Sequence, residues 1–302
     1  MRRADATDLA GSTAVGSLVA FVLLTLVVTG QDGAPLFGDQ DLNAWSADHR
    51  PPVALAVARG LTYTGTGLVP YVLVALAGVV LGRTARQRIV FALGCVGCLA
   101  AAQAVRYGVM SLVARPRPAT AEWATHASGW SFPSGHTTTS AIVGGLLILA
   151  VLARAPRGGR TLAALLACWA VLVGLTRVYL GVHWFSDVLG GWLFALCWLS
   201  LSVYALARIA PHTFSSISAL RLRPGPTTEE RPDDSHPHRE VPLTRLRDHL
   251  GWAVGASYLA AAALCLAAGL WLRHPHMIGA AGIPHIAFET PRFLLSLLLF
   301  SA

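Results

Sequence analysis

A histidine and an aspartate stand four residues apart in segment 176–187, at His183 and Asp187. On a helix this spacing puts both side chains on one face, so the carboxylate can accept a hydrogen bond from one imidazole nitrogen while the other faces a substrate. This is the arrangement of an activated nucleophile and its orienting group. Arg177 precedes His183 by six residues, which on one straight helix turns it away from that face. A break near Gly181 would bring the two together.

A second polar cluster, Pro-Ser-Gly-His at residues 133–136, stands directly before an apolar run. A serine hydroxyl, an unhindered glycine backbone and the free N–H groups of a helix N-terminus form a cradle for an anion, with a titratable imidazole beside it.

A third cluster contains Arg115 and Arg117, each followed by proline. Proline disfavours a helical conformation in the residue before it, so two guanidinium groups are presented on an extended segment. Such groups bind phosphate oxygens in bidentate fashion. Arginines at a membrane interface can alternatively bind lipid head groups or extend to the surface without a role in chemistry.

Apolar helices must position these clusters. Of the 302 residues, 54% are apolar and 13% are charged, whereas an average soluble domain has about 25% charged residues. A bilayer core is spanned by about 20 apolar residues in a helix. The stretches without Asp, Glu or Arg that approach this length are residues 9–31, 60–82, 89–105, 132–153, 161–176, 188–207 and 250–272, the third continuing to about residue 113. The sequence therefore predicts an all-α, polytopic membrane protein.

The arginine residues predict how the chain crosses the membrane. All 23 basic residues are arginine, and they form no stripe with interleaved aromatic residues, so we expect no nucleic-acid partner. Loops 83–88 and 154–160 hold three arginines each, whereas loop 32–50 holds four aspartates and one arginine. The positive-inside rule then makes the N-terminus and the arginine-rich loops cytoplasmic. Loops 32–50, 115–133 and 177–187 are expected on the extracytoplasmic side, with all three polar clusters.

Three regions follow from the composition. Residues 1–208 form a six-helix unit, and residues 209–250 a cytoplasmic linker that is partly disordered because it is rich in proline and charge. Residues 251–302 form a hydrophobic appendage. Its last segment, residues 293–302, is too short to span alone and lies at the interface or belongs to an incomplete eighth helix. The first apolar run lacks a small-residue cleavage site, so we expect an uncleaved helix there, not a signal peptide.

The three clusters, in this order on exterior loops of a six-helix unit, resemble the motifs of the phosphatidic acid phosphatase type 2 superfamily. The matching parts are the Arg-Pro cluster at 115–118, Pro-Ser-Gly-His at 133–136 and the segment 176–187, which contains Arg-x5-His-x3-Asp. The likeness extends over about residues 1–208 and leaves residues 209–302 uncovered.

This resemblance implies a lipid phosphatase that forms a phosphohistidine and needs no metal ion or other cofactor. His183 would attack phosphorus, Asp187 would hold its tautomer, and His136 would protonate the leaving oxygen and later activate water. The expected phosphate-binding residues are Arg106, Arg115, Arg117, Ser134, Gly135 and Arg177.

One departure from the family motif concerns a lysine that the family places seven residues before Arg117. Here that position is Met110. Arg106 lies one turn earlier on the same helix face. It either takes over part of the phosphate contact or extends toward lipid head groups.

The expected partners are a lipid phosphate substrate and the membrane lipids. The same motifs resemble vanadium-dependent haloperoxidases, but those are soluble, which the charge-free runs argue against. An exterior site at the bilayer surface suits polyprenyl diphosphate of the undecaprenyl type as first choice, with phosphatidic acid and phosphatidylglycerol phosphate as alternatives. A membrane transporter or lipid flippase using His183 and Asp187 as a proton relay is a competing hypothesis. It leaves the Arg-Pro and Pro-Ser-Gly-His clusters unexplained.

Overall fold

The computed structural model describes residues 3–154 and 156–210, and every regular element in these residues is helical. The long helices are α1 (Arg3–Gly30), α5 (Ala85–Val113), α6 (Gly135–Arg154), α7 (Gly159–Tyr179) and α8 (Phe185–Ile209). The shorter elements are α2 (Asp39–Asp48), α3 (Pro52–Tyr63), α4 (Val69–Leu81) and the 3₁₀ turn η1 (Thr120–Glu122). The expected linker beyond Ala210 and the appendage 251–302 lie outside the described residues.

Five of these helices are long and apolar enough to cross a membrane, namely α1, α5, α6, α7 and α8, and α4 is a shorter apolar helix. The prediction of an all-helical, multi-pass membrane protein is confirmed. The prediction of one continuous helix over residues 60–82 is wrong, because α3 ends at Tyr63 and α4 begins at Val69. Gly67 in the connecting turn has a φ of 66°, and Pro70 stands in the first turn of α4, where its missing N–H costs nothing.

Local signals explain the two ends of α5. The hydroxyl of Thr84 accepts a hydrogen bond from the backbone N–H of Gln87 at 3.2 Å, and the Gln87 side chain reaches back to the N-cap backbone, which completes a capping box. The C-terminal end is marked by Ala114, in a left-handed conformation directly before Arg115 and Pro116. The polar segment therefore leaves the bundle immediately after α5.

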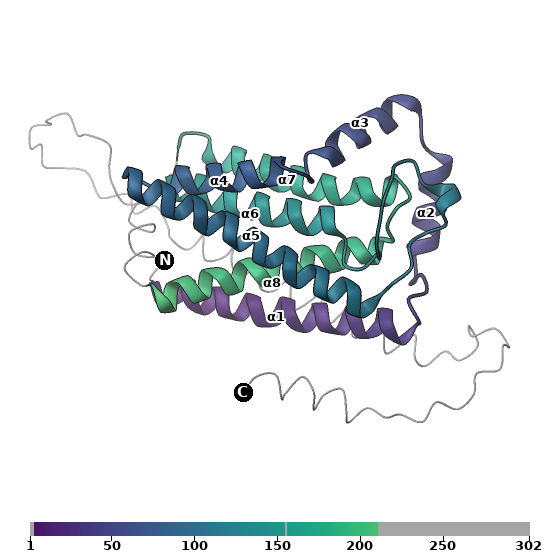
Figure 1. Ribbon diagram of the computed structural model, residues 1–302, viewed down its shortest axis with the longest axis horizontal. Coiled ribbons are helices and arrows are strands. Elements are labelled where there is room, and N and C mark those ends of the chain that lie inside the picture. Colours follow the sequence, from purple (N-terminus) through teal and green to yellow (C-terminus); the bar gives the residue numbers. More distant parts are fainter. Residues whose placement is uncertain (1–2, 155, 211–302) are drawn as a thin grey trace, which may run out of the picture. The chain divides into compact units, whose positions relative to one another are not determined.

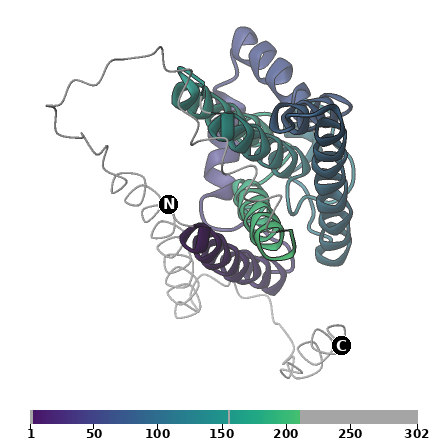
Figure 2. The same cartoon turned by 90° about the vertical axis from the view of Figure 1, so that its left-hand side faces the viewer.

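Helix α1 lies beside α8 in both views of the molecule (Figures 1 and 2). Phe21 of α1 stacks on Phe132 with ring centroids 5.8 Å apart, and meets Phe194 of α8 edge to face at 5.6 Å. Such pairs contribute more than the area they bury. Because Phe132 directly precedes the Pro-Ser-Gly-His cluster, this core contact anchors that cluster to the bundle.

The polar clusters all lie at one end of the bundle. α1, α5 and α7 finish there, α6 and α8 begin there, and α2 lies across it, with α3 reaching away from the other helices (Figure 1). The arginine-rich turns lie at the opposite end, where Arg154 donates hydrogen bonds to the carbonyl oxygens of Val80 at 2.5 Å and Gly82 at 2.6 Å. Alternating helix direction therefore brings together segments that are far apart in sequence.

Candidate active site

The turn between α7 and α8 is built around Gly181, which has a φ of 71°. A Cβ atom at this position would lie 2.4 Å from the backbone oxygen of Glu122, so the turn requires glycine both for its conformation and for the close approach. The predicted break near Gly181 is confirmed. His183 and Asp187 do not lie on one helix, however. Asp187 is in the first turn of α8, whereas His183 belongs to the turn that precedes this helix.

Asp187 is held by several hydrogen bonds at the start of α8. Its Oδ2 atom accepts from the backbone N–H of Trp184 at 2.9 Å and from the hydroxyl of Ser131. The same oxygen lies 3.4 Å from Nδ1 of His183. Asp187 is fully buried and His183 is 2% exposed. The carboxylate therefore has a fixed orientation toward one nitrogen of the imidazole.

The other imidazole nitrogen of His183, Nε2, lies 2.8 Å from Nη1 of Arg117. A guanidinium group only donates hydrogen bonds, so Nε2 accepts and carries a lone pair. The proton of the neutral imidazole is then on Nδ1, facing Asp187. Burial lowers the pKa of His183 to about 4, although the hydrogen bond with Asp187 acts in the opposite direction. Near neutral pH the imidazole is therefore uncharged and has the tautomer of a nucleophile.

The Pro-Ser-Gly-His cluster forms the start of α6, as its composition predicted. The backbone N–H of Ser134 donates to the Asp187 carbonyl at 3.1 Å, which ties this cluster to α8. Gly191 allows α8 to approach so closely, since a Cβ there would lie 2.9 Å from Cβ of Thr137 and 3.1 Å from the Ser134 carbonyl oxygen. The hydroxyl of Ser134 accepts from Thr137 at 2.9 Å.

His136 lies among the cationic groups of the site. In the described part of the chain, its imidazole has no hydrogen-bond partner. The groups whose charges act on it are Arg106, Arg117, Arg177 and His183. The structure thus collects the second histidine, the first histidine and three of the predicted phosphate-binding arginines in one place.

Arg177 has an unused donor. Its side chain is 2% exposed, and Nη1 donates to the hydroxyl of Thr62 on α3 at 2.8 Å. Its Nε atom is buried without a partner among the described residues. Buried donors are normally satisfied, so this one is suited to the oxygen of an anionic ligand. Thr62 gave no signal in the sequence, because only tertiary structure places α3 against α7.

Arg106 is directed into the site and is only 4% exposed. Its Nε donates to Gln103 at 2.8 Å, and its Nη1 lies 3.6 Å from the sulfur of Met110. A Cβ atom on Gly135 would lie 3.2 Å from the guanidinium carbon of Arg106. Of the two alternatives, the one in which Arg106 extends to lipid head groups does not match this position.

Arg115 has a different environment from the other arginines. All five of its N–H groups donate within hydrogen-bond distance to protein acceptors, which are the backbone oxygens of Gly33 and Ala34 and the side chains of Asp39, Ser186 and Asp187. No donor remains for a phosphate, so this arrangement does not match the expected phosphate contact of Arg115. No sequence motif singles out Asp39 or Ser186, and only the fold brings them to Arg115.

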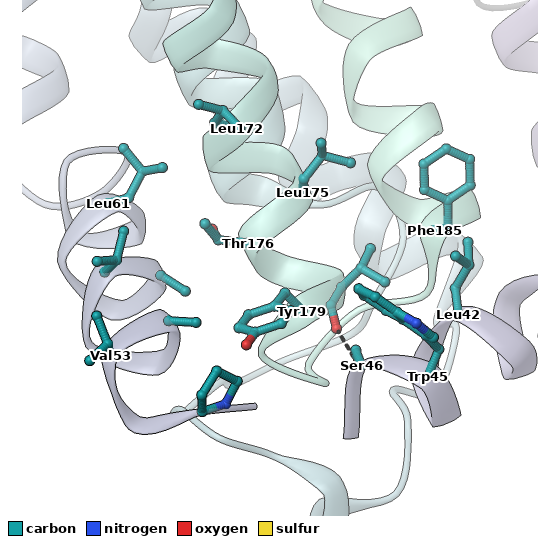
Figure 3. Close-up of a pocket in the computed structure, with 15 residues that line it drawn as sticks. Leu42, Trp45, Ser46, Val53, Leu61, Leu172, Leu175, Thr176, Tyr179 and Phe185 are labelled. Atoms are coloured by element: carbon teal, nitrogen blue, oxygen red, sulfur yellow. Dashed lines mark hydrogen bonds between the residues drawn. The ribbon is translucent and has the colours of Figure 1, made fainter. Parts of the chain in front are cut away.

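No group of three or more His, Cys, Asp or Glu side chains that could hold a metal ion is present among residues 3–154 and 156–210. An apolar cavity of about 760 Å³ lies on the outer face of α7, between α2 and α3 (Figure 3). Leu61, Thr176 and Tyr179 are among the residues that line it. Thr176 directly precedes Arg177, so this apolar surface is close in the chain to the polar site.

The described residues form a helical membrane bundle with a cluster of histidine and arginine side chains at one end. Residues 91–211, which include all three motifs, match the model of the PAP2 superfamily. This segment thus has the sequence pattern of the PAP2 superfamily of membrane phosphatases.

Two similar proteins come from Bacillus subtilis. Phosphatidylglycerophosphatase B of strain 168 is 39% identical over 74 residues, which are 24% of this chain and 36% of that relative. The matched segment is thus about a third of the curated relative's length. The crystal structure of a transmembrane PAP2-type phosphatidylglycerolphosphate phosphatase superposes with a TM-score of 0.54 and 25% identity, covering 63% of this chain and 93% of the other.

Proposed function

We propose that the protein is an integral membrane lipid phosphatase that hydrolyses a phosphate monoester or diphosphate through a phosphohistidine at His183. The observation that carries this proposal is the contact between Arg117 and Nε2 of His183, with Asp187 on the Nδ1 side. This arrangement makes the His183 imidazole a buried, neutral group whose Nε2 lone pair faces the Arg117 cation.

In the first step, Nε2 of His183 attacks phosphorus, and the phosphorus–oxygen bond to the leaving group breaks. His136, which the negative charge of the bound phosphate keeps protonated, gives its proton to the leaving oxygen. Asp187 stabilises the positive charge that develops on the His183 ring. In the second step, His136 takes a proton from water, the water oxygen bonds to phosphorus, and the phosphorus–nitrogen bond breaks to release inorganic phosphate.

Arginine charge replaces the metal ion that many phosphoryl-transfer sites use. Phosphoryl transfer depends mainly on positioning and on stabilising charge on the equatorial oxygens. Arg106, Arg117 and Arg177 surround the position of the phosphate, and the Arg117 contact with Nε2 would pass to a phosphoryl oxygen as the new bond forms. We infer that the reaction needs no divalent metal.

The substrate that this site suits is a phosphate carried by a lipid. The similarity to a phosphatidylglycerophosphatase and to a phosphatidylglycerolphosphate phosphatase of B. subtilis favours phosphatidylglycerol phosphate. Polyprenyl diphosphate, the first choice from the sequence, and phosphatidic acid share the same chemistry at the phosphate. The apolar cavity beside α7 offers a surface suited to hydrocarbon chains.

The experiment is release of inorganic phosphate by purified protein from these three lipids in mixed micelles, with and without chelator. His183→Ala should abolish turnover in folded protein, and Asp187→Asn should retain part of it, since the attacking atom remains. His126→Ala is the matched control, because His126 is exposed and lies outside the site. Wild-type enzyme quenched during turnover should carry acid-labile phosphate on His183. Undiminished phosphate release by His183→Ala would exclude the mechanism.

Two further arms address the metal and the competing hypothesis. Chelator should leave the rate unchanged and vanadate should inhibit; activity that is lost in chelator and restored by magnesium would contradict the metal-free reaction. Lipid movement across vesicles without any phosphate release would favour a flippase.

A further inference from the structure

A buried polar network connects the start of α2 to the start of α8. Asp39 is 2% exposed, and its Oδ1 atom accepts from the backbone N–H of Ser186 at 2.9 Å. Its Oδ2 atom accepts from the hydroxyl of Ser186 at 2.5 Å and from the backbone N–H of Leu36 at 2.8 Å. Asp39 is thus bound to the residue next to Asp187.

Arg115 joins the two carboxylates of this network. Its Nη2 lies 3.1 Å from Asp39, and its Nη1 lies 2.6 Å from Oδ1 of Asp187. The Arg115 side chain is completely buried. The loop before α2 approaches it closely, since a Cβ on Gly33 would lie 2.7 Å from the ring of Pro116. One positive charge is therefore shared between two negative charges, away from water.

The two oxygens of Asp187 have different partners. Oδ1 faces Arg115, whereas Oδ2 faces Nδ1 of His183. The attraction of Asp187 for the Nδ1 proton depends on how much of its charge Arg115 neutralises. That amount depends in turn on Asp39, because charge effects are strong over short distances in a buried site.

We propose that Arg115 and Asp39 are positioning residues that set the orientation and effective charge of Asp187, and through it the proton affinity of His183. The proposal rests on the proposed function, in which His183 is the nucleophile. The other charged or titratable groups that face His183 are Arg117 from the loop after α5, His136 from α6 and Arg177 from α7. All three are unchanged in the variants below.

The test compares the pH dependence of kcat/KM in two variants with opposite expected shifts. In Asp39→Asn, Arg115 neutralises Asp187 more fully, so the proton affinity of His183 falls and the acidic limb moves to lower pH by about half a unit or more. In Arg115→Gln, Asp187 keeps its full charge and the limb moves to higher pH. In both variants kcat should change and KM should not. Asp41→Asn removes the same charge from an exposed position of α2 and should leave the profile unchanged.

The double variant Asp39→Asn/Arg115→Gln is included in case a single variant does not fold. Removing both charges leaves no unpaired charge at either position. Its acidic limb should return toward that of the wild type. The rate of hydrogen–deuterium exchange at C2 of His183, followed by mass spectrometry against pH, reports the same proton affinity without turnover.

Two results separate the network from the function. If the pH profiles of exchange and of rate in every variant are the same as in the wild type, the network has no effect on His183 and the proposal is overturned. The proposal is also overturned if Arg115→Gln only raises KM or weakens vanadate inhibition, since Arg115 would then bind phosphate directly. A wild-type protein that releases no phosphate would overturn the proposed function, while the exchange profiles would still show whether Arg115 and Asp39 act on His183.

Discussion

We expect Arg106 to take the place of a lysine that the family motif contains. Met110 stands where that motif has lysine, and the guanidinium group of Arg106 lies between Met110 and Gly135. We expect Arg106→Ala to lower kcat/KM by an amount equivalent to about 1–3 kcal/mol, the range for one hydrogen bond to a charged group. Met110→Lys introduced into that variant should restore part of the loss.

The measurement is turnover per folded molecule for the single and double variants. Arg208→Ala is a matched control, because each of the two arginines lies over a tyrosine ring. Arg106 lies 4.0 Å from the ring centre of Tyr107, and Arg208 lies 5.3 Å from that of Tyr204, in the last turn of α8. An unchanged rate in Arg106→Ala would assign Arg106 no contact with the phosphate.

The environment of His183 also predicts a pH dependence. Only the neutral imidazole can attack, and burial lowers the pKa of His183 to about 4, so the acidic limb of kcat/KM should lie well below the usual histidine value of about 6.5. In the complex with the anionic substrate, the basic limb of kcat should follow loss of the proton from His136, and the two limbs report the coupled histidine pair. A rate that rises continuously into alkaline pH would favour attack by hydroxide.

The lowered pKa of His183 also makes the stability of the folded protein depend on pH. The direction follows from comparing the folded state with the unfolded state. Unfolded His183 takes up a proton near pH 6.5 and the folded form only near pH 4. The folded state therefore binds fewer protons between these values and loses stability as the pH falls from about 6.5 to about 4. Thermal unfolding of the detergent-solubilised protein across this range measures the effect.

The turn between α7 and α8 depends on Gly181. Gly181→Ala would place a side chain in a left-handed conformation, at a cost of about 1–2 kcal/mol, and against the backbone of Glu122. We expect a lower melting temperature and a larger loss of turnover, because the displaced turn carries His183. Gly97→Ala is the matched control, since a Cβ there meets nothing within 4 Å. Equal effects of the two substitutions would show that the turn does not position the site.

The boundary between α3 and α4 shows where helix prediction fails. Residues 60–82 carry no charge, so they satisfy the length criterion for one membrane helix. The break between Tyr63 and Val69 has a structural consequence, because it lets Thr62 on α3 reach Arg177 on α7. Hydropathy measures transfer of a segment into lipid and contains no information on such a contact.

The orientation of the whole chain in the membrane stays a prediction from its arginine residues. The site end of the bundle should face the exterior and the arginine-rich turns the cytoplasm. In a background with the five cysteines replaced by alanine, a membrane-impermeant maleimide should label Ala119→Cys on intact cells and Thr161→Cys only after permeabilisation. Both positions are exposed, at opposite ends of the bundle. The reverse labelling would invert the topology.

The sequence alone was sufficient to predict the all-helical membrane architecture, the family and the break at Gly181. These depend on properties that act along the chain, namely hydrophobic length, helix period and the conformational limits of proline and glycine. The motif residues His183, Asp187 and His136 were recognised from their spacing for the same reason. These residues lie on separate loops, but each motif is short enough to be identified within its own segment of the sequence.

Only the tertiary structure shows which groups each arginine contacts. Arg106, Arg115 and Arg117 are the same residue type, but Arg106 lies against Gly135, Arg117 contacts Nε2 of His183, and Arg115 is fully paired with acceptors from the loop before α2 and the start of α8. Asp39 and Ser186 are separated by 147 positions, and their hydrogen bond exists only because the fold places the start of α2 against the start of α8. A contact between distant segments leaves no periodic signal in the sequence, because its energy depends on the packing of the whole bundle.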